Sequence, residues 1–299
     1  MKLMEQPRVW RSSVDRRYYK QSEPRIYEAQ MIQPSDITGI EAVTILDEVL
    51  GLAAPQYVLR QICRPVRMDS LTARVDIATK LTGQEKVPPL VEAELSSQSY
   101  TTVDFDLWKN VVHIVVSDEA RKKAAHDILG LHVSDAARDL ARMENKQIME
   151  ELAGATDVAG SDWGNTANNP YDDVVGAITA IEGNGYPADF IAADPLVWAD
   201  FLSNPFVRGT MQGVQYPAGK VFPVPGLPGV TGYSDGALPD TVAYVGSRAA
   251  PAVVFGEGPT EAARYRDEKS GYDAYIIRSW LQPELVQSDA IRELTGVHA

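Results

Sequence analysis

The sequence contains one cysteine in 299 residues and no apolar run long enough to cross a membrane. Cys63 has no second thiol to pair with, so disulfide bonds cannot hold the fold together, and the sequence fits a reducing compartment. A spanning helix needs about 18 or more consecutive apolar residues, and the first twenty residues lack the apolar stretch of a signal peptide. We therefore expect no membrane contact, and we expect Cys63 to be a small buried side chain.

Local motifs of common catalytic and cofactor sites are also absent. There is no G-x-S-x-G, P-loop, G-x-G-x-x-G after a strand, H-E-x-x-H or C-x-x-C pattern. No histidine has a second ligand at metal spacing, and His113 within VVHIVV is expected to be a core or interface residue. The segment 154–170 lacks the spacing and the terminal Glu of a calcium loop, so it is expected to be a plain loop. The sequence predicts no cofactor, no metal and no enzymatic activity.

Positive charge is scarce outside the N-terminal segment. The formal net charge is −13, yet residues 1–27 carry seven Lys and Arg against three Asp and Glu, which makes that segment +4 and leaves −17 for the rest. An acidic body disfavours a nucleic-acid reader built on a basic face. Two roles for the basic arm stay open: contact with a polyanion such as DNA, or docking on an acidic neighbouring copy of the chain.

The first half of the chain predicts one short helix and one long hairpin. The segment 40–51 favours an amphipathic helix that ends at Gly51, with an apolar face formed by Ile40, Val43, Ile45 and Val49. Apolar and polar residues then alternate through 71–78 and again from 100 to 107, with a turn-rich tip between them, and VVHIVV (111–116) continues the second strand into a buried region. Both the arm and a two-stranded ribbon of this length need another surface to become ordered.

Helical periodicity is strongest between Asp127 and Leu152. One stripe contains Val133, Ala137, Leu140, Ala141, Ile148 and Leu152. Gly154 supplies the stop, and a shorter helix follows the N-cap Ser117.

The second half of the chain alternates helices and strands. Pro170 opens a helix with an apolar face at Val174, Val175, Ile178 and Ile181. A strand follows at 190–193, a helix capped by Asp194, irregular short strands at 221–236, strands at 241–246 and 252–256, and a final hairpin that turns at Lys269-Ser270-Gly271 with Trp280 buried beyond it. The fold class is therefore α+β.

The order of these elements resembles the major capsid protein of tailed phages, the Hong Kong 97-type fold that encapsulin shells share. The resemblance is carried by VDFDLWKNVVHIVV leading into the long helix (103–154), by PADFIAADPLVWADF (187–201) and by the closing strands (266–296). It implies an N-terminal arm (1–65), an E-loop hairpin (66–110), a P-domain with a spine helix (111–165) and its closing strands (246–299), and an A-domain (166–245).

By the same resemblance, copies of the chain form pentamers and hexamers of an icosahedral virion shell around double-stranded DNA, assembled in the host cytoplasm. Further partners implied are a separate scaffolding protein, a portal and decoration proteins. Candidate assembly contacts are the arm and hairpin-tip residues Arg8, Trp10, Arg11, Arg16, Arg17, Lys80 and Lys86.

Two departures from the family pattern matter. Some members crosslink an E-loop Lys to a P-domain Asn, but here no Asn follows Asn204, so we expect no isopeptide crosslink. The chain starts only about 65 residues before the hairpin, so we expect a separate scaffold or none, and no maturation cleavage. Three alternatives stay open: an encapsulin-type shell that encloses protein cargo, an α+β enzyme whose site has no local signature, and an adhesion or scaffold-binding module.

Overall fold

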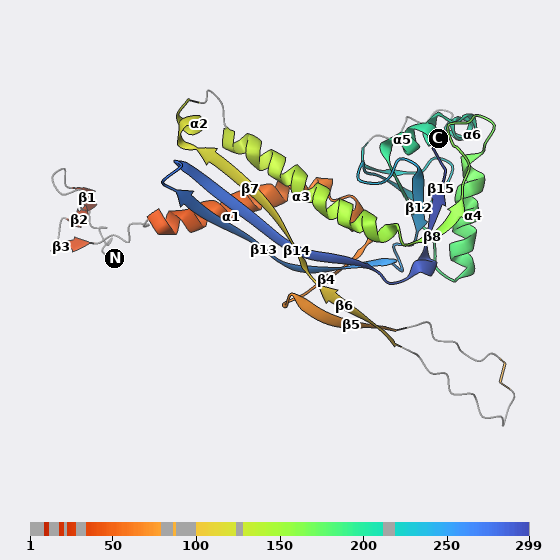
Figure 1. Ribbon diagram of the computed structural model, residues 1–299, viewed down its shortest axis with the longest axis horizontal. Helices are drawn as coiled ribbons and strands as arrows, with labels where there is room; N and C mark the ends of the chain where they lie inside the picture. Colours follow the sequence, from red (N-terminus) through yellow and green to blue (C-terminus); the bar gives the residue numbers. More distant parts are fainter. Residues whose placement is uncertain are drawn as a thin grey trace, which may run out of the picture.

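The computed structural model describes residues 9–11, 18–20, 23–27, 34–78, 86–87, 100–123, 128–211 and 219–298. They form an elongated body with two long helices on a four-stranded sheet at one end and a compact α/β unit at the other (Figure 1). A hairpin projects from the middle of the body. None of the helices in these ranges combines the length and the apolar character that crossing a bilayer requires.

The four-stranded sheet has the order β4 (Arg64–Arg67), β13 (Val253–Asp267), β14 (Tyr272–Leu285), β7 (Trp108–Ser117). β13 and β14 form the predicted antiparallel hairpin, and Gly271 has the positive φ of +64° that its turn needs. The strand predicted at 252–256 is only the beginning of β13, which runs on for 15 residues through a bulge between Glu257 and Thr260. Trp280 is half-buried rather than buried.

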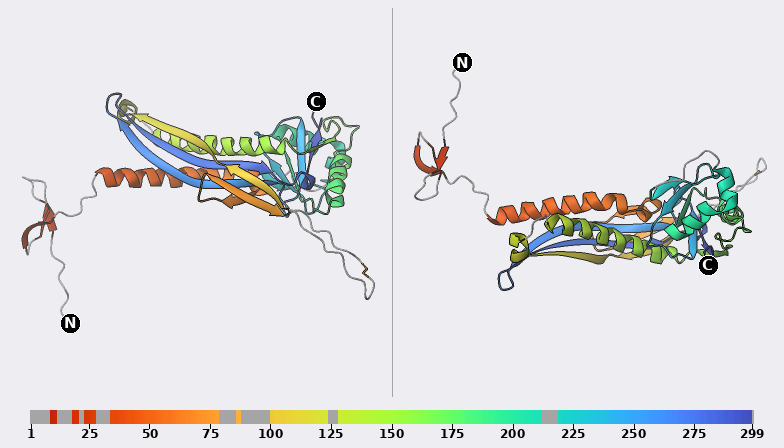
Figure 2. Two further views of the ribbon diagram at one scale, coloured as in Figure 1. Left: turned by 60° about the horizontal axis from the view of Figure 1, so that its bottom comes forward. Right: turned by 90° about the horizontal axis from the view of Figure 1, so that it is seen from above.

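Helix α3 (Ile128–Leu152) confirms the predicted spine helix, because every residue of its predicted stripe is buried. α3 lies over β14 and β7, and α1 (Pro34–Ala53) lies beside it over β13 (Figure 2). α2 (Asp118–Lys123) follows β7, and Ser117 caps it by accepting a hydrogen bond from the Ala120 N–H, as predicted. The two long helices share one apolar cluster with β7 and β14.

The prediction for α1 needs correction. The helix begins at Pro34 rather than Ile40 and continues past Gly51 to Ala53. Pro55, which cannot donate a backbone hydrogen bond, marks its end. Ile45, Val49 and Ala53 are buried against α3 and the sheet, whereas Val43 is exposed. This part of the arm therefore packs within its own subunit.

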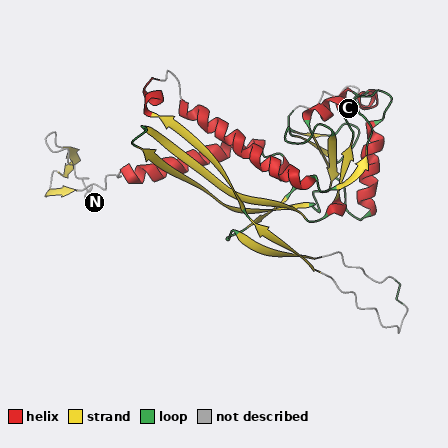
Figure 3. Cartoon of the chain, in the orientation of Figure 1, coloured by secondary structure: helices red, strands yellow, loops and turns green. Residues whose placement is uncertain are grey.

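The compact unit contains a six-stranded sheet with the order β10 (Val221–Pro223), β11 (Thr231–Ser234), β9 (Phe190–Ala193), β12 (Val242–Gly246), β15 (Ile291–Thr295), β8 (Thr156–Ala159). Its helices are α4 (Pro170–Gly183), α5 (Pro195–Ser203) and α6 (Pro205–Thr210), shown with the sheet in Figure 3. Pro170 and Asp194 act as predicted, and Val174 and Ile181 of the predicted face are buried, but Val175 is exposed and Ala177 is buried in its place.

Two strands of this sheet come from outside the predicted A-domain range of 166–245. β8 lies in the segment expected to be a plain loop, and β15 lies in the stretch expected to close the P-domain. β15 pairs with both β8 and β12, so the end of the described chain belongs to the six-stranded sheet.

The remaining strands form two small sheets. β5 (Thr72–Ala78) and β6 (Tyr100–Asp106) pair antiparallel, which confirms the base of the predicted hairpin. β1 (Val9–Arg11), β2 (Tyr18–Lys20) and β3 (Glu23–Tyr27) pair with one another. Short 3₁₀ turns occur at η1 (Ala54–Gln56), η2 (Leu59–Ile62) and η3 (Ser288–Ala290).

Candidate assembly surfaces

The ribbon of β5 and β6 is the first candidate surface. Its strands pair only with each other within the described residues. Arg74 and Asp104 lie opposite each other and form an ion pair with an Nε–Oδ1 distance of 2.6 Å. Both side chains are largely exposed, and Tyr100 at the start of β6 is 65% exposed. Exposed ion pairs contribute little to stability, so this pair does little to hold the ribbon on its own.

The root of the ribbon, in contrast, is firmly anchored. Met68, Phe105, Leu107 and Val254 form a buried cluster against β13. The Leu107 N–H donates to the Leu71 carbonyl at 2.8 Å, and the Met68 N–H donates to the Glu257 carbonyl at 2.9 Å. Gly258 permits this close approach, because a Cβ there would lie 2.9 Å from a Leu107 methyl carbon. The ribbon therefore leaves the body in a fixed direction.

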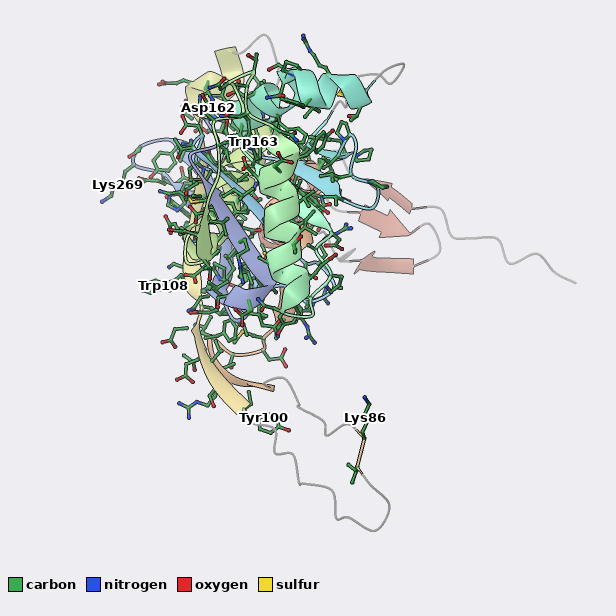
Figure 4. All side chains as sticks on the ribbon, turned by 90° about the vertical axis from the view of Figure 1, so that its right-hand side faces the viewer. Lys86, Tyr100, Trp108, Asp162, Trp163 and Lys269 are labelled. Carbon is green, nitrogen blue, oxygen red and sulfur yellow. The ribbon has the colours of Figure 1, made fainter. Side chains whose placement is uncertain are left out.

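The second candidate surface is the edge strand β7. It pairs with β14 on one side, and no strand in the described ranges pairs with its other side. VVHIVV is half-exposed rather than buried as predicted, because strand alternation points Ile114 and Val116 inward and Val111, His113 and Val115 outward. Trp108 at the start of the strand is 69% exposed and stands out from the body in Figure 4. An open strand edge with exposed apolar side chains is typical of an interaction surface.

The third candidate surface is the tip formed by α2 and the β13–β14 turn. The Arg266 guanidinium donates to both oxygens of Asp118, at 3.1 and 2.7 Å, and to Glu268 at 2.7 Å. The Lys269 N–H donates to Asp267 and holds the pKa of that carboxyl below its usual range. Lys269 itself projects from the turn (Figure 4). These contacts tie residues 148 positions apart into one preformed tip.

A buried polar cluster lies beneath these surfaces, where α3 meets η2 and β13. The Glu144 side chain on α3 is 7% exposed, and its Oε2 lies 3.8 Å from Nη1 of Arg60. Arg60 also makes a close ion pair with Glu257, and its guanidinium stacks on the rings of Phe255 and Tyr57. The pKa of Glu144 is raised to about 7: burial is the largest cause, the charge of Arg60 opposes it, and the charge of Glu257 adds to it.

The next residue of α3 links the spine helix to the compact unit. The Asn145 side-chain amide donates to the Gln56 carbonyl at 3.1 Å and to Asp235, after β11, at 2.9 Å. Asp235 is buried, and Lys220 lies 3.6 Å from its carboxylate. Glu144 and Asn145 together fasten the segment after α1 to the spine helix.

Sequence reasoning did not identify these two residues, although a signal was present. The apolar stripe of α3 passes from Ala141 to Ile148 without the apolar residue expected one turn on, and Glu144 and Asn145 occupy that turn. A polar pair inside an otherwise apolar stripe indicates buried polar contacts.

Most of the predicted contact residues lie outside the described part of the chain. Arg8, Arg16, Arg17 and Lys80 fall there, and Trp10 and Arg11 are described only as backbone of β1. Lys86 is exposed and has a φ of +55° (Figure 4). Their role in assembly stays a prediction.

Cys63 is buried as expected, and burial raises its thiol pKa. In the described residues, no group of three or more His, Cys, Asp or Glu could hold a metal ion.

The family model described as phage capsid protein matches residues 114–286, which include the end of β7, the spine helix, most of the compact unit and the strands β13 and β14. No curated protein matches the sequence.

Solved structures with a similar fold include phage structures and a virus-like particle. The Gordonia phage Cozz structure matches with a TM-score of 0.62 and 15% identity, covering 80% of this chain and 86% of the other. The cyanophage P-SCSP1u capsid gives 0.61 and 14%, covering 81% and 89%. The Pyrococcus furiosus virus-like particle gives 0.60 and 12%, covering 85% and 99%. At these identities the likeness concerns the fold, which is the Hong Kong 97-type.

Proposed function

The chain belongs to the phage capsid protein family, and on that basis we propose that its copies assemble as pentamers and hexamers that close around double-stranded DNA. The chain is a major capsid protein, a structural subunit of an icosahedral virion shell. We propose that it has no enzymatic activity of its own.

One observation carries the proposal: among the described residues, a two-stranded ribbon projects from the body and one edge of the four-stranded sheet has no pairing strand. β5 and β6 pair only with each other within the described residues, and β7 leaves one edge open beside the exposed Trp108. A two-stranded ribbon is marginal alone in water, and open edges favour association. A second copy of the same chain supplies the missing surface in a closed symmetric assembly.

The parts of the chain take the roles that the family pattern implies. Residues 1–65 act as an arm, 66–110 as the E-loop, 111–165 with 246–299 as the P-domain, and 166–245 as the A-domain. β8 and β15 join the A-domain sheet and link it to the P-domain. The basic arm straps a neighbouring acidic subunit or contacts the packaged DNA.

Further partners belong to the same proposal. A separate scaffolding protein, a portal and decoration proteins are partners of such a shell, the packaged DNA is contacted without sequence specificity, and assembly takes place in the host cytoplasm.

The first test is negative-stain electron microscopy of the purified chain, checked by light scattering. Closed shells, or rings of five or six subunits, are expected. A monomer or dimer that stays unassembled with added scaffold or a crowding agent would overturn the proposal.

A second function is favoured by the likeness to the Pyrococcus furiosus virus-like particle, which extends over 99% of that chain. In this alternative the shell is of the encapsulin type and encloses a protein cargo. Nuclease treatment and mass spectrometry of purified particles separate the two, because a genome shell contains protected DNA and a cargo shell contains a second protein.

A further inference from the structure

The segment that connects α1 to β4 is held by two adjacent residues of the spine helix. Asn145 binds the Gln56 carbonyl, and Glu144 faces Arg60 at 3.8 Å. Backbone hydrogen bonds within the segment are local, such as those from the Val58 N–H to the Gln56 carbonyl and from the Cys63 N–H to the Arg60 carbonyl. Val58, Leu59 and Ile62 are also buried in an apolar cluster, so the position of the segment is set by apolar packing together with the polar side-chain contacts to α3 and β13.

The charges in this contact are unbalanced. The titratable and charged groups that face Glu144 in the described residues are Arg60 from η2, Tyr57 from the turn before it and Glu257 from β13. Arg60 makes its close ion pair with Glu257 and stacks on Phe255. One guanidinium thus serves two carboxylates, and the buried one is the more distant. Ionising Glu144 places a second negative charge in a site with only one cation.

The cluster also lies where the root of the ribbon and the compact unit both contact the sheet and the spine helix. Glu257 is the last paired residue before the bulge that interrupts β13 and β14, and its carbonyl accepts the bond from Met68 at the root of the ribbon. One residue along the helix, Asn145 holds Asp235 of the compact unit. Arg60 is therefore connected through Glu257 to the root of the ribbon, and the neighbouring Asn145 connects the same turn of α3 to the compact unit.

We propose that the protonation state of Glu144 sets how often residues 54–62 open away from the spine helix and the β13 bulge: rarely when Glu144 is protonated, and more often when it is ionised. The consequence for a shell, a subunit shape that depends on pH, rests on the proposed function. The opening of residues 54–62 is a property of the single chain and is measured on unassembled protein. The test can therefore support or contradict it whether or not shells form.

Cys63 provides the readout, because it is the only thiol in the sequence and lies buried at the end of the segment. The unassembled full-length chain is reacted with 4,4′-dithiodipyridine between pH 5 and pH 8, as wild type and as Glu144→Gln. The ratio of the two labelling rates cancels the ionisation of the thiol and the chemistry of the reagent, so it reports only opening that depends on Glu144.

The expected ratio rises about tenfold per pH unit between roughly pH 5 and pH 7 and levels off above pH 7. The reason is that the pKa of Glu144 is about 7 in the closed state, while in the open state it returns towards its ordinary value near 4.5. The closed state gains stability from the extra proton below this window and loses it as the pH rises.

Glu150→Gln is the matched control, since Glu150 is an exposed carboxyl on the same helix, and it should reproduce the wild-type profile. If Glu144→Gln does not fold, Glu257→Gln tests the same contact, because removing the neighbouring carboxylate lowers the pKa of Glu144 and moves the plateau to lower pH. A wild-type profile that is parallel to that of Glu144→Gln, or unchanged by Glu257→Gln, overturns the proposal.

Discussion

Asn110 on β7 and Gln147 on α3 exchange a reciprocal pair of side-chain amide hydrogen bonds, with nitrogen–oxygen distances of 3.1 and 3.0 Å. Asn110 is buried, and its partner is half-buried. The pair joins the edge strand of the sheet to the spine helix next to the polar cluster around Glu144, so the packing of α3 on the four-stranded sheet is specified by polar contacts as well as by apolar ones.

The first prediction concerns this pair. Asn110→Ala leaves the Gln147 amide without its partner and should lower the free energy of unfolding by about 1–3 kcal/mol. The double variant Asn110→Ala with Gln147→Ala should cost less than the sum of the single variants, because the unpaired group is removed too. Urea unfolding of the unassembled chain measures all three. Additive losses would contradict the contact.

The second prediction tests how the ribbon is anchored. Gly258→Ala places a Cβ 2.9 Å from a Leu107 methyl carbon and 3.0 Å from the Trp280 Cβ. The overpacking should destabilise the chain by about 1–3 kcal/mol.

Gly176→Ala is the matched control. Gly176 lies inside α4 with nothing within 4 Å of the added Cβ, so the substitution should stabilise the chain by up to about 1 kcal/mol. Thermal unfolding distinguishes the two, and equal effects of both variants would refute the close approach at Gly258.

These contacts show which features the sequence could predict. The stripe of α3, the hairpin bases and the capping by Ser117 and Asp194 follow from periodicity and local hydrogen bonding, and all are confirmed. Local patterns contain no information on which strand a segment will meet, so β8 was expected to be a loop, and nothing in the sequence indicated that β15 would pair with β8 and β12. Val175 was placed on the wrong face, and VVHIVV was expected to be buried throughout, because an apolar residue or an apolar run does not by itself fix the buried face.

Some features of the candidate assembly surfaces could likewise be predicted from the sequence, and others could not. That a ribbon and a basic arm need another surface follows from composition and strand physics, whereas the Glu144–Arg60–Glu257 cluster joins residues up to 197 positions apart. Only the gap in the α3 stripe signalled that Glu144 and Asn145 would be buried.

The third prediction concerns His298, whose Nδ1 lies against the Asp200 carboxylate. The hydrogen bond to Asp200 raises the pKa of His298 above its ordinary value near 6.5. The pair therefore contributes stability that is fully present below pH 6.5 and is lost as the pH rises through the raised pKa. In an NMR titration, Asp200→Asn should return the His298 pKa towards its ordinary value, while Asp139→Asn, at an exposed carboxyl on α3, should leave it unchanged. No difference between the variants would exclude the contact.

The fourth prediction is that assembled particles contain no isopeptide crosslink. Lys86 is exposed, but the sequence has no Asn after Asn204 to receive an attack from a lysine of the hairpin. Particles boiled in detergent should run as a single band of 32.7 kDa on a denaturing gel. Covalent ladders at multiples of that mass would contradict the prediction.

The fifth prediction tests the β7 surface. Val111→Thr with Val115→Thr keeps the β-branched shape and replaces one exposed methyl group of each side chain by a hydroxyl. Substitutions at exposed positions usually change stability by no more than about 0.5 kcal/mol, so the unassembled chain should unfold as wild type does. Particle yield, measured by light scattering and electron microscopy, should fall because these methyl groups become buried against a second copy.

Val175→Thr is the control for this variant, since Val175 is an exposed valine on α4, away from the sheet edge. It introduces the same chemical change, so its particle yield separates a specific contact at β7 from a general loss of apolar surface. Wild-type yield from the β7 double variant would show that the open edge of the sheet is not an assembly contact, and the ribbon of β5 and β6 would then have to supply the interface without it.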